Sequence, residues 1–117
     1  MPLHVASAST SPASLTAIKE QYVIFYASRD ESGRMWCGDC RDVEHLVERT
    51  FDGSDAPSAL IVYVGHKPEW KTPSNPFRAE PWLVQSIPTV VRTTDNARLV
   101  EGEIGMLLEQ FIKPLQS

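Results

Sequence analysis

The sequence predicts an α/β fold in which helices flank a central mixed sheet, and three observations support this. Residues 22–27 and 59–64 are short apolar runs rich in β-branched and aromatic residues, a pattern typical of buried strands. The amphipathic segment between them has the length of a helix, so the three pieces form a strand–helix–strand unit with a parallel strand pair. Residues 87–101 contain two further strand-like runs around a turn, which predicts a hairpin and makes the sheet mixed.

The N-terminal segment predicts two short elements. Residues 3–6 alternate in polarity, which indicates an edge strand. Ser11 is a suitable N-cap and Pro12 suits the first helical position, so we expect a short helix over residues 11–21 with Leu15 and Ile18 facing inward.

The middle of the chain predicts a polar loop, a helix and a long connection. A polar loop over residues 28–34 follows the first central strand, and the next helix is expected to end near Thr50. The second central strand leads into a proline-rich connection over residues 65–81, where Asn75 and Pro76 indicate a short helical turn. A connection of this length in a compact domain is usually functional.

The C-terminal part predicts the hairpin and a closing helix. Residues 87–92 and 98–101 are its strands, joined by a turn at residues 94–96. From Glu103 the apolar residues recur at helical spacing, and the helix is expected to stop near Pro114.

Length and composition suit one domain spanning residues 1–117. The chain is 42% hydrophobic and 22% charged, enough for a core of ordinary size. Its net charge is −4 and its basic residues do not cluster, which argues against nucleic-acid binding and anionic membrane surfaces. No apolar run approaches the roughly 18 residues of a transmembrane helix. Residues 1–17 lack a secretory signal and contain no Arg, so we expect a cytoplasmic protein and favour organelle import less.

Both cysteines lie in the motif Trp36-Cys37-Gly38-Asp39-Cys40. Thiols three positions apart at the start of a helix share one face and can close a disulfide. The free N–H groups and the dipole of the helix N-terminus favour a thiolate at Cys37, whereas the charge of Asp39 opposes it. Cys37 is therefore the candidate nucleophile and Cys40 the candidate resolving thiol.

Two other interpretations of the cysteine pair are weaker. A zinc site would need two more ligands from His4, His45 and His66, which lack the usual His-x₃₋₅-His spacing, so we predict no metal site. Inert buried thiols are the second alternative. In a reducing compartment a lone cysteine pair is more often catalytic than structural.

The order of elements resembles thioredoxin, and the motifs resemble the family of small thioredoxin-related proteins of the thioredoxin domain-containing protein 17 type. Besides the Trp-Cys-x-Asp-Cys motif, the resemblance rests on residues 28–33, 64–71 and 73–78, and it covers about residues 20–103. It implies a thioredoxin-like fold and a dithiol that reduces disulfides without a bound cofactor. The electrons would come from NADPH through thioredoxin reductase, so that enzyme and disulfide substrates are the expected partners.

The resemblance also assigns residues that shape the site. In thioredoxin-like folds the proline matching Pro88 is cis and lies against the cysteine pair, which leaves the backbone of Ile87 free to pair with an extended substrate. An ordinary trans proline is the alternative. Trp36 is expected on the exposed rim of the site, with a core position as the alternative. Four further aromatic residues, which either line a groove or pack in the core, are Tyr63, Trp70, Phe77 and Trp82.

The sequence departs from the family at three places. Gly38 stands where the family has Pro, which frees the loop between the cysteines. Ile24 occupies the strand position where general thioredoxins have a buried Asp, so no carboxylate is available there to take a proton from Cys40. Residues 80–82 interrupt a segment that the family builds as a helix.

These observations lead to two functional hypotheses. The first is a thiol–disulfide oxidoreductase, a protein-disulfide reductase that acts on small or exposed disulfides through Cys37 and Cys40. The second is a redox-inactive binding module that kept the fold. The presence of both thiols favours the enzyme, and a disulfide isomerase or oxidase would require a secretory signal that we do not find.

Overall fold

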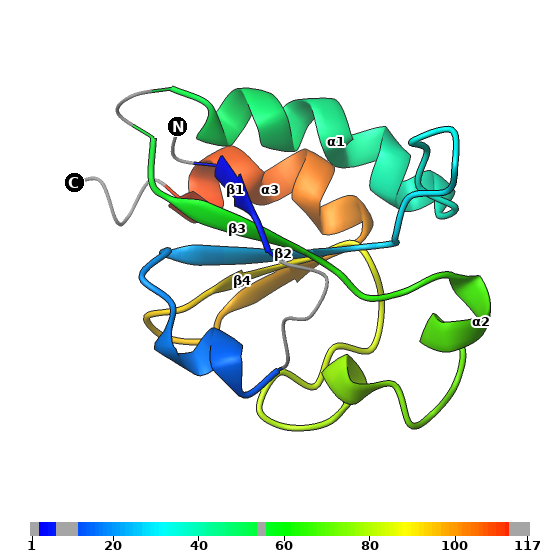
Figure 1. Cartoon of the computed structure of the whole chain (residues 1–117). Coiled ribbons are helices and arrows are strands. Elements are labelled where there is room, and N and C mark those ends of the chain that lie inside the picture. Colours follow the sequence, from blue (N-terminus) through cyan, green and yellow to red (C-terminus); the bar gives the residue numbers. More distant parts are fainter. Residues whose placement is uncertain (1–2, 7–11, 54–55, 113–117) are drawn as a thin grey trace.

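The computed structural model describes residues 3–6, 12–53 and 56–112, and it confirms the α/β class (Figure 1). Five strands form one sheet in the order β1–β3–β2–β4–β5. The strands are β1 (Leu3–Val5), β2 (Tyr22–Tyr26), β3 (Ala59–Tyr63), β4 (Thr89–Arg92) and β5 (Arg98–Val100). The helical elements are η1 (Ser14–Ala17), α1 (Gly38–Phe51), α2 (Lys67–Trp70), η2 (Pro76–Arg78) and α3 (Gly102–Ile112).

The sheet is mixed, as expected. Strand β3 pairs in parallel with both β1 and β2, so β2, α1 and β3 form the predicted strand–helix–strand unit. On the other side of β2, strands β4 and β5 are antiparallel and form the predicted hairpin. All five residues of β2 are buried, because this central strand has a neighbour on each side and is covered on both faces.

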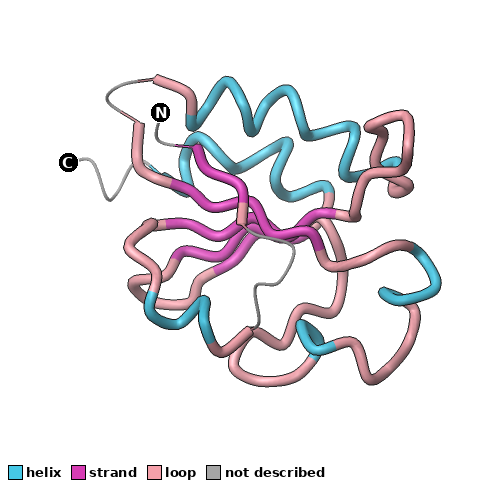
Figure 2. Tube along the Cα trace, viewed as in Figure 1, coloured by secondary structure: helices cyan, strands magenta, loops and turns pink. Residues whose placement is uncertain are grey.

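The two faces of the sheet are covered differently. Helices α1 and α3 pack side by side on one face, whereas Figure 2 shows that loops and short turns cover most of the other. On the helical face, Tyr22 contacts Phe51 of α1 at a ring-centroid distance of 5.4 Å. On the opposite face, Phe25 contacts Phe77 at 5.8 Å and Trp82 at 5.7 Å. The alternation of side chains along β2 therefore supplies both halves of the core.

The predicted helix over residues 11–21 is wrong in length. Ser11 lies outside the described residues, and only the 3₁₀ turn η1 forms, after which Ile18 is extended with ψ 157°. The Trp82 indole N–H donates to the Pro12 carbonyl at 3.0 Å, and Leu15 is buried as expected. A segment of this length has little helical stability of its own, so tertiary contacts determine its conformation.

The other predicted elements differ from the structure mainly at their ends. Strand β4 begins at Thr89, because residues 87 and 88 lie outside the ladder. Helix α3 begins at Gly102 and is described as far as Ile112, so the expected end near Pro114 lies outside the described residues. None of the described helices has the length and apolar character needed to cross a bilayer.

Candidate active site

The cysteine motif lies where β2 leads into α1, at the same edge of the sheet as the end of β3 (Figure 1). Cys37 is the N-cap of α1 with φ −92° and ψ 120°, and its carbonyl accepts the N–H of Arg41 at 3.2 Å. Cys40 is the third residue of the helix and is completely buried, whereas Cys37 is half-buried. Cys37 thus lies beside the unpaired amide groups of a helix N-terminus, as expected.

The two thiols are free, and they lie near enough to influence each other electrostatically. The Cys40 sulfur accepts the N–H of Ala27 at 3.4 Å. Burial raises the pKa of the Cys40 thiol; the Ala27 hydrogen bond opposes this, and the nearby Cys37 and Asp39 raise the pKa further. Cys40 therefore rests as a protonated thiol, which is the state expected of a resolving cysteine before attack.

The Ile87–Pro88 peptide is cis, which confirms the expectation drawn from the resemblance. Both residues are buried, and the Cys37 thiol points at the Ile87 carbonyl with a sulfur–oxygen distance of 3.8 Å. The backbone of Ile87 therefore lies directly against the candidate nucleophile. A second cis peptide, Glu80–Pro81, was not predicted and occurs in the segment where the sequence departs from the family.

Trp36 joins the motif to the end of β3. Its side chain is half-buried rather than freely exposed on the rim, and the indole N–H donates to the Gly65 carbonyl at 2.9 Å. The same carbonyl accepts the N–H of Ser28 at 3.1 Å, and the Gly65 N–H donates to the Ser28 hydroxyl at 3.0 Å. Gly65 has φ 126°, a conformation that side chains rarely adopt, and a Cβ there would lie 3.0 Å from the Glu69 Cβ.

Gly38 and Asp39 form the exposed first turn of α1. A Cβ at Gly38 would meet the Arg41 guanidinium at 3.5 Å, an ordinary van der Waals contact. The site therefore has room for a Cβ at this first helical position. Asp39 suits the positive end of the helix dipole, while its charge disfavours a second anion at Cys40.

The segment of residues 28–35 is a structured loop, although most of it is exposed. The Asp30 Oδ1 accepts the N–H of Ser32 at 2.9 Å, the Ser32 hydroxyl at 2.6 Å and the N–H of Arg34 at 3.1 Å. The hydrogen bonds from Ser32 and Arg34 lower the pKa of Asp30. The loop is closed by a bridge between Arg29 and the buried Met35.

Arg29 ties this loop to the rest of the fold. Its Nε donates to the Tyr63 hydroxyl at 2.9 Å and its Nη1 to the Gly33 carbonyl at 2.9 Å, while Nη2 forms an ion pair with Glu44. One guanidinium thereby links the loop to both β3 and α1. Sequence reasoning missed Arg29, Glu44 and the buried Tyr26 beside them. The spacing of four residues between Cys40 and Glu44, which places both on one helix face, was an available signal.

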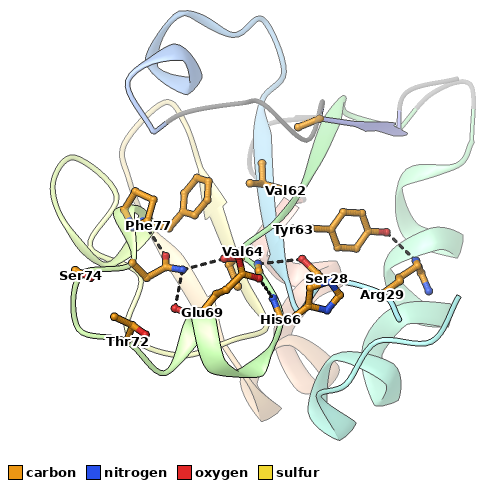
Figure 3. Close-up of a pocket in the computed structure, with 14 residues that line it drawn as sticks. Ser28, Arg29, Val62, Tyr63, Val64, His66, Glu69, Thr72, Ser74 and Phe77 are labelled. Carbon is orange, nitrogen blue, oxygen red and sulfur yellow. Dashed lines mark hydrogen bonds between the residues drawn. The ribbon is translucent and has the colours of Figure 1, made fainter. Parts of the chain in front are cut away.

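A pocket of about 740 Å³ lies between the 28–35 loop and the long connection, and Arg29 is one of its lining residues (Figure 3). Asn75 is one of its lining residues: its Nδ2 donates to the Val64 carbonyl at 2.9 Å and its Oδ1 accepts the N–H of Phe77 at 3.0 Å. The predicted N-cap at Asn75 is confirmed. Three of the four aromatic residues considered above are buried core residues, namely Trp70, Phe77 and Trp82.

Among the described residues, no group of three or more His, Cys, Asp or Glu side chains is arranged to hold a metal ion. The chemistry available at the motif is that of a thiol pair: one sulfur is partly exposed beside a helix N-terminus, and the other is buried behind it. Such a pair can exchange with a disulfide and close on itself.

The sheet order, the dithiol at the N-terminus of α1 and the cis-proline beside it define a thioredoxin-like domain. A family profile described as thioredoxin domain-containing protein 17-like, thioredoxin domain, matches residues 7–115. The chain therefore belongs to this family.

Curated relatives have similar sequences over the same region. The chain is 35% identical over 86 residues to the thioredoxin-like protein Clot of Oryza sativa, with 68% of this chain and 62% of the rice protein covered. It is 34% identical over 86 residues to thioredoxin domain-containing protein 17 of Homo sapiens, with 73% and 69% covered. The mouse protein of that name is 31% identical over 93 residues, with 74% and 75% covered. Membership of this family indicates a function of the thiol-oxidoreductase type.

Proposed function

We propose that this protein is a disulfide reductase that acts on small or exposed disulfides, with Cys37 as nucleophile and Cys40 as resolving thiol. The observation that carries the proposal is the asymmetry of the two sulfurs. Cys37 is half-buried at the N-cap of α1, whereas Cys40 is completely buried and held by the Ala27 amide. One sulfur can thus meet a substrate while the other waits within reach of it.

The reaction proceeds in two exchange steps. The Cys37 thiolate attacks one sulfur of the substrate disulfide, the disulfide bond breaks, and the first substrate thiolate leaves and takes up a proton. Cys40 then loses its proton and attacks the Cys37 sulfur of the mixed disulfide, which releases the second thiolate. The substrate gains two electrons and the protein is left with a Cys37–Cys40 disulfide.

Electrons for the next cycle come, in this proposal, from NADPH through thioredoxin reductase, and no cofactor is bound to the chain. A reducing compartment such as the cytosol would keep the dithiol available. The Ile87 backbone, next to Cys37, offers a place where an extended substrate can pair as an added strand.

We further propose that substrate size is restricted. The 28–35 loop is held in place by Asp30 and Arg29, and the connection that begins at Gly65 is tied to Trp36. Both segments flank the motif and favour disulfides that are small or project from their carrier.

The test is an NADPH-coupled assay with thioredoxin reductase that compares a small disulfide with a large folded protein containing disulfides. The parent protein should reduce the small disulfide faster. Cys37→Ser should abolish turnover, and Cys40→Ser should stop after one mixed disulfide per molecule, seen as a mass increase. Turnover that survives Cys37→Ser would contradict the assignment. Absence of turnover in the parent, with retained binding of a partner, would favour the binding module instead.

A further inference from the structure

The resolving step requires Cys40 to lose a proton, and the surroundings of this thiol raise the question of where the proton goes. Cys40 is completely buried, so bulk water does not reach it. Ala27 supplies a donor rather than a base. On β2, the buried side chain of Ile24 is apolar and cannot accept a proton.

We propose that Glu44 accepts the proton of Cys40 during resolution and that the Tyr26 hydroxyl lies on the path between them. This inference rests on the proposed function, because it assigns a role within the second exchange step. It adds a proton acceptor and a relay residue to the two cysteines.

Glu44 is well placed on α1. It follows Cys40 by four residues, so the two side chains lie on one face of the helix, one turn apart. The Glu44 side chain is 25% exposed and forms an ion pair with Arg29, which is itself fixed by the Tyr63 hydroxyl. The carboxylate therefore lies at the boundary between the buried thiol and solvent, where it can pass a proton outward.

Tyr26 is a buried residue of β2 and a neighbour of both groups. Its side chain is 1% exposed, and its hydroxyl has no hydrogen-bond partner among the described residues. Burial raises the pKa of the Tyr26 hydroxyl, and the neighbouring Glu44 and Cys40 raise it further. A phenol can accept one hydrogen bond and donate another, so an unpaired hydroxyl near both groups can join the thiol to the carboxylate through internal water.

The other charged groups nearby are less suited to this role. Asp39 is exposed in the first turn of α1 and acts on Cys40 only as a like charge. Glu48 is exposed one turn beyond Glu44. Arg29 is a cation, and the Tyr63 hydroxyl is occupied as the acceptor of the Arg29 Nε–H.

The proposed step balances in protons and electrons. Cys40-SH gives its proton to the Glu44 carboxylate, and the new Cys40 thiolate attacks the Cys37 sulfur. The bond between Cys37 and the substrate sulfur breaks, and the leaving substrate thiolate takes up the proton from Glu44, directly or through solvent. Glu44 returns to the carboxylate form that pairs with Arg29.

A rapid-mixing experiment separates the two exchange steps. The reduced full-length protein is mixed with an aromatic disulfide that releases a coloured thiolate at each step. The first release reports the attack by Cys37, and the second reports resolution by Cys40. Both rates are followed against pH for the parent protein and for Glu44→Gln and Tyr26→Phe. The matched control is Glu48→Gln, which removes an exposed carboxylate from the next turn of the same helix.

We expect Glu44→Gln to slow the second release at least about tenfold at neutral pH and to change the first by less than about twofold. The difference should shrink at alkaline pH, where hydroxide takes over as the base. Tyr26→Phe should slow the second release by a smaller factor, and Glu48→Gln should change neither.

Arg29→Gln distinguishes a proton acceptor from a merely structural partner, because it breaks the ion pair but keeps the carboxylate. We expect this variant to retain a fast second release. If it slows resolution as much as Glu44→Gln does, or if Glu44→Gln leaves resolution unchanged, the inference is wrong. Absence of any second release in the parent protein would instead contradict the proposed function.

Discussion

The two segments that flank the cysteine motif are fixed to the fold by different means. The 28–35 loop is held by polar contacts, mostly at the surface, through Asp30 and Arg29. The connection over residues 65–81 is anchored by buried side chains, namely Trp70 and Phe77, which are 3% and 6% exposed, and Asn75.

This difference separates adjustable parts of the site from parts that the fold requires. Exposed polar contacts contribute little net free energy, because water competes for the same groups. Buried aromatic side chains and buried hydrogen bonds contribute much more. The exposed residues 30–34 of this loop can therefore change, and with them the access to Cys37, at small cost to stability. The buried residues of the 65–81 connection cannot change in this way.

The largest effect is expected for Phe77→Ala. This change removes the ring that packs on Phe25 of β2 and should lower the free energy of unfolding by about 3–5 kcal/mol. Chemical denaturation measures the loss, and Leu83→Ala, at a side chain that is 47% exposed, serves as the control with little expected effect. A loss below about 1 kcal/mol for Phe77→Ala would mean that the connection is not anchored by its buried residues.

A smaller loss is expected for Asn75→Ala. The substitution leaves the Val64 carbonyl and the Phe77 N–H without their side-chain partners in a buried region, which should cost about 1–3 kcal/mol. Ser74→Ala, at the exposed neighbouring position, should be close to neutral in the same denaturation experiment. If the two substitutions cost the same, the buried hydrogen bonds of Asn75 do not anchor the connection.

The smallest effect is expected in the 28–35 loop when the pH is lowered. The pKa of Asp30 is lower in the folded chain than in the unfolded chain, because Ser32 and Arg34 donate hydrogen bonds to it. The contribution of these hydrogen bonds to the stability of the folded loop is thus complete above the ordinary carboxyl pKa. It is lost as the pH falls through the lowered pKa of the folded chain. The amide resonances of Ser32 and Arg34 should titrate together in acid, while that of Trp70 stays constant. A midpoint at or above the ordinary carboxyl value would contradict this assignment.

Sequence reasoning succeeded where local pattern and burial agree. Strands β2 and β3 are continuous apolar runs and α1 has one apolar face, so the position of the motif between them followed from the pattern alone. The cis state of Pro88 came from the family resemblance, because residue type alone favours trans.

The remaining features depend on contacts between residues distant in sequence. Trp82 holds the residue Pro12 before η1 from 70 positions away, a contact that the local sequence pattern does not show. Arg29 reaches Glu44 across 15 positions, and the pattern of residues 28–34 shows only a polar loop. In the sequence Tyr26 is indistinguishable from the other residues of a buried strand, so only the structure shows that its hydroxyl is unpaired.

The hydrogen bond between Trp36 and Gly65 has a consequence for how this architecture can diverge. It uses Gly65, the first residue of the long connection and two positions beyond β3, so changes at exposed positions further along that segment leave it intact. The orientation of the residue preceding Cys37 is thus inherited from the sheet rather than from the connection. Homologous chains can therefore change the exposed positions of the segment to suit new substrates, provided that the buried anchors stay, while the reactive sulfur keeps its place.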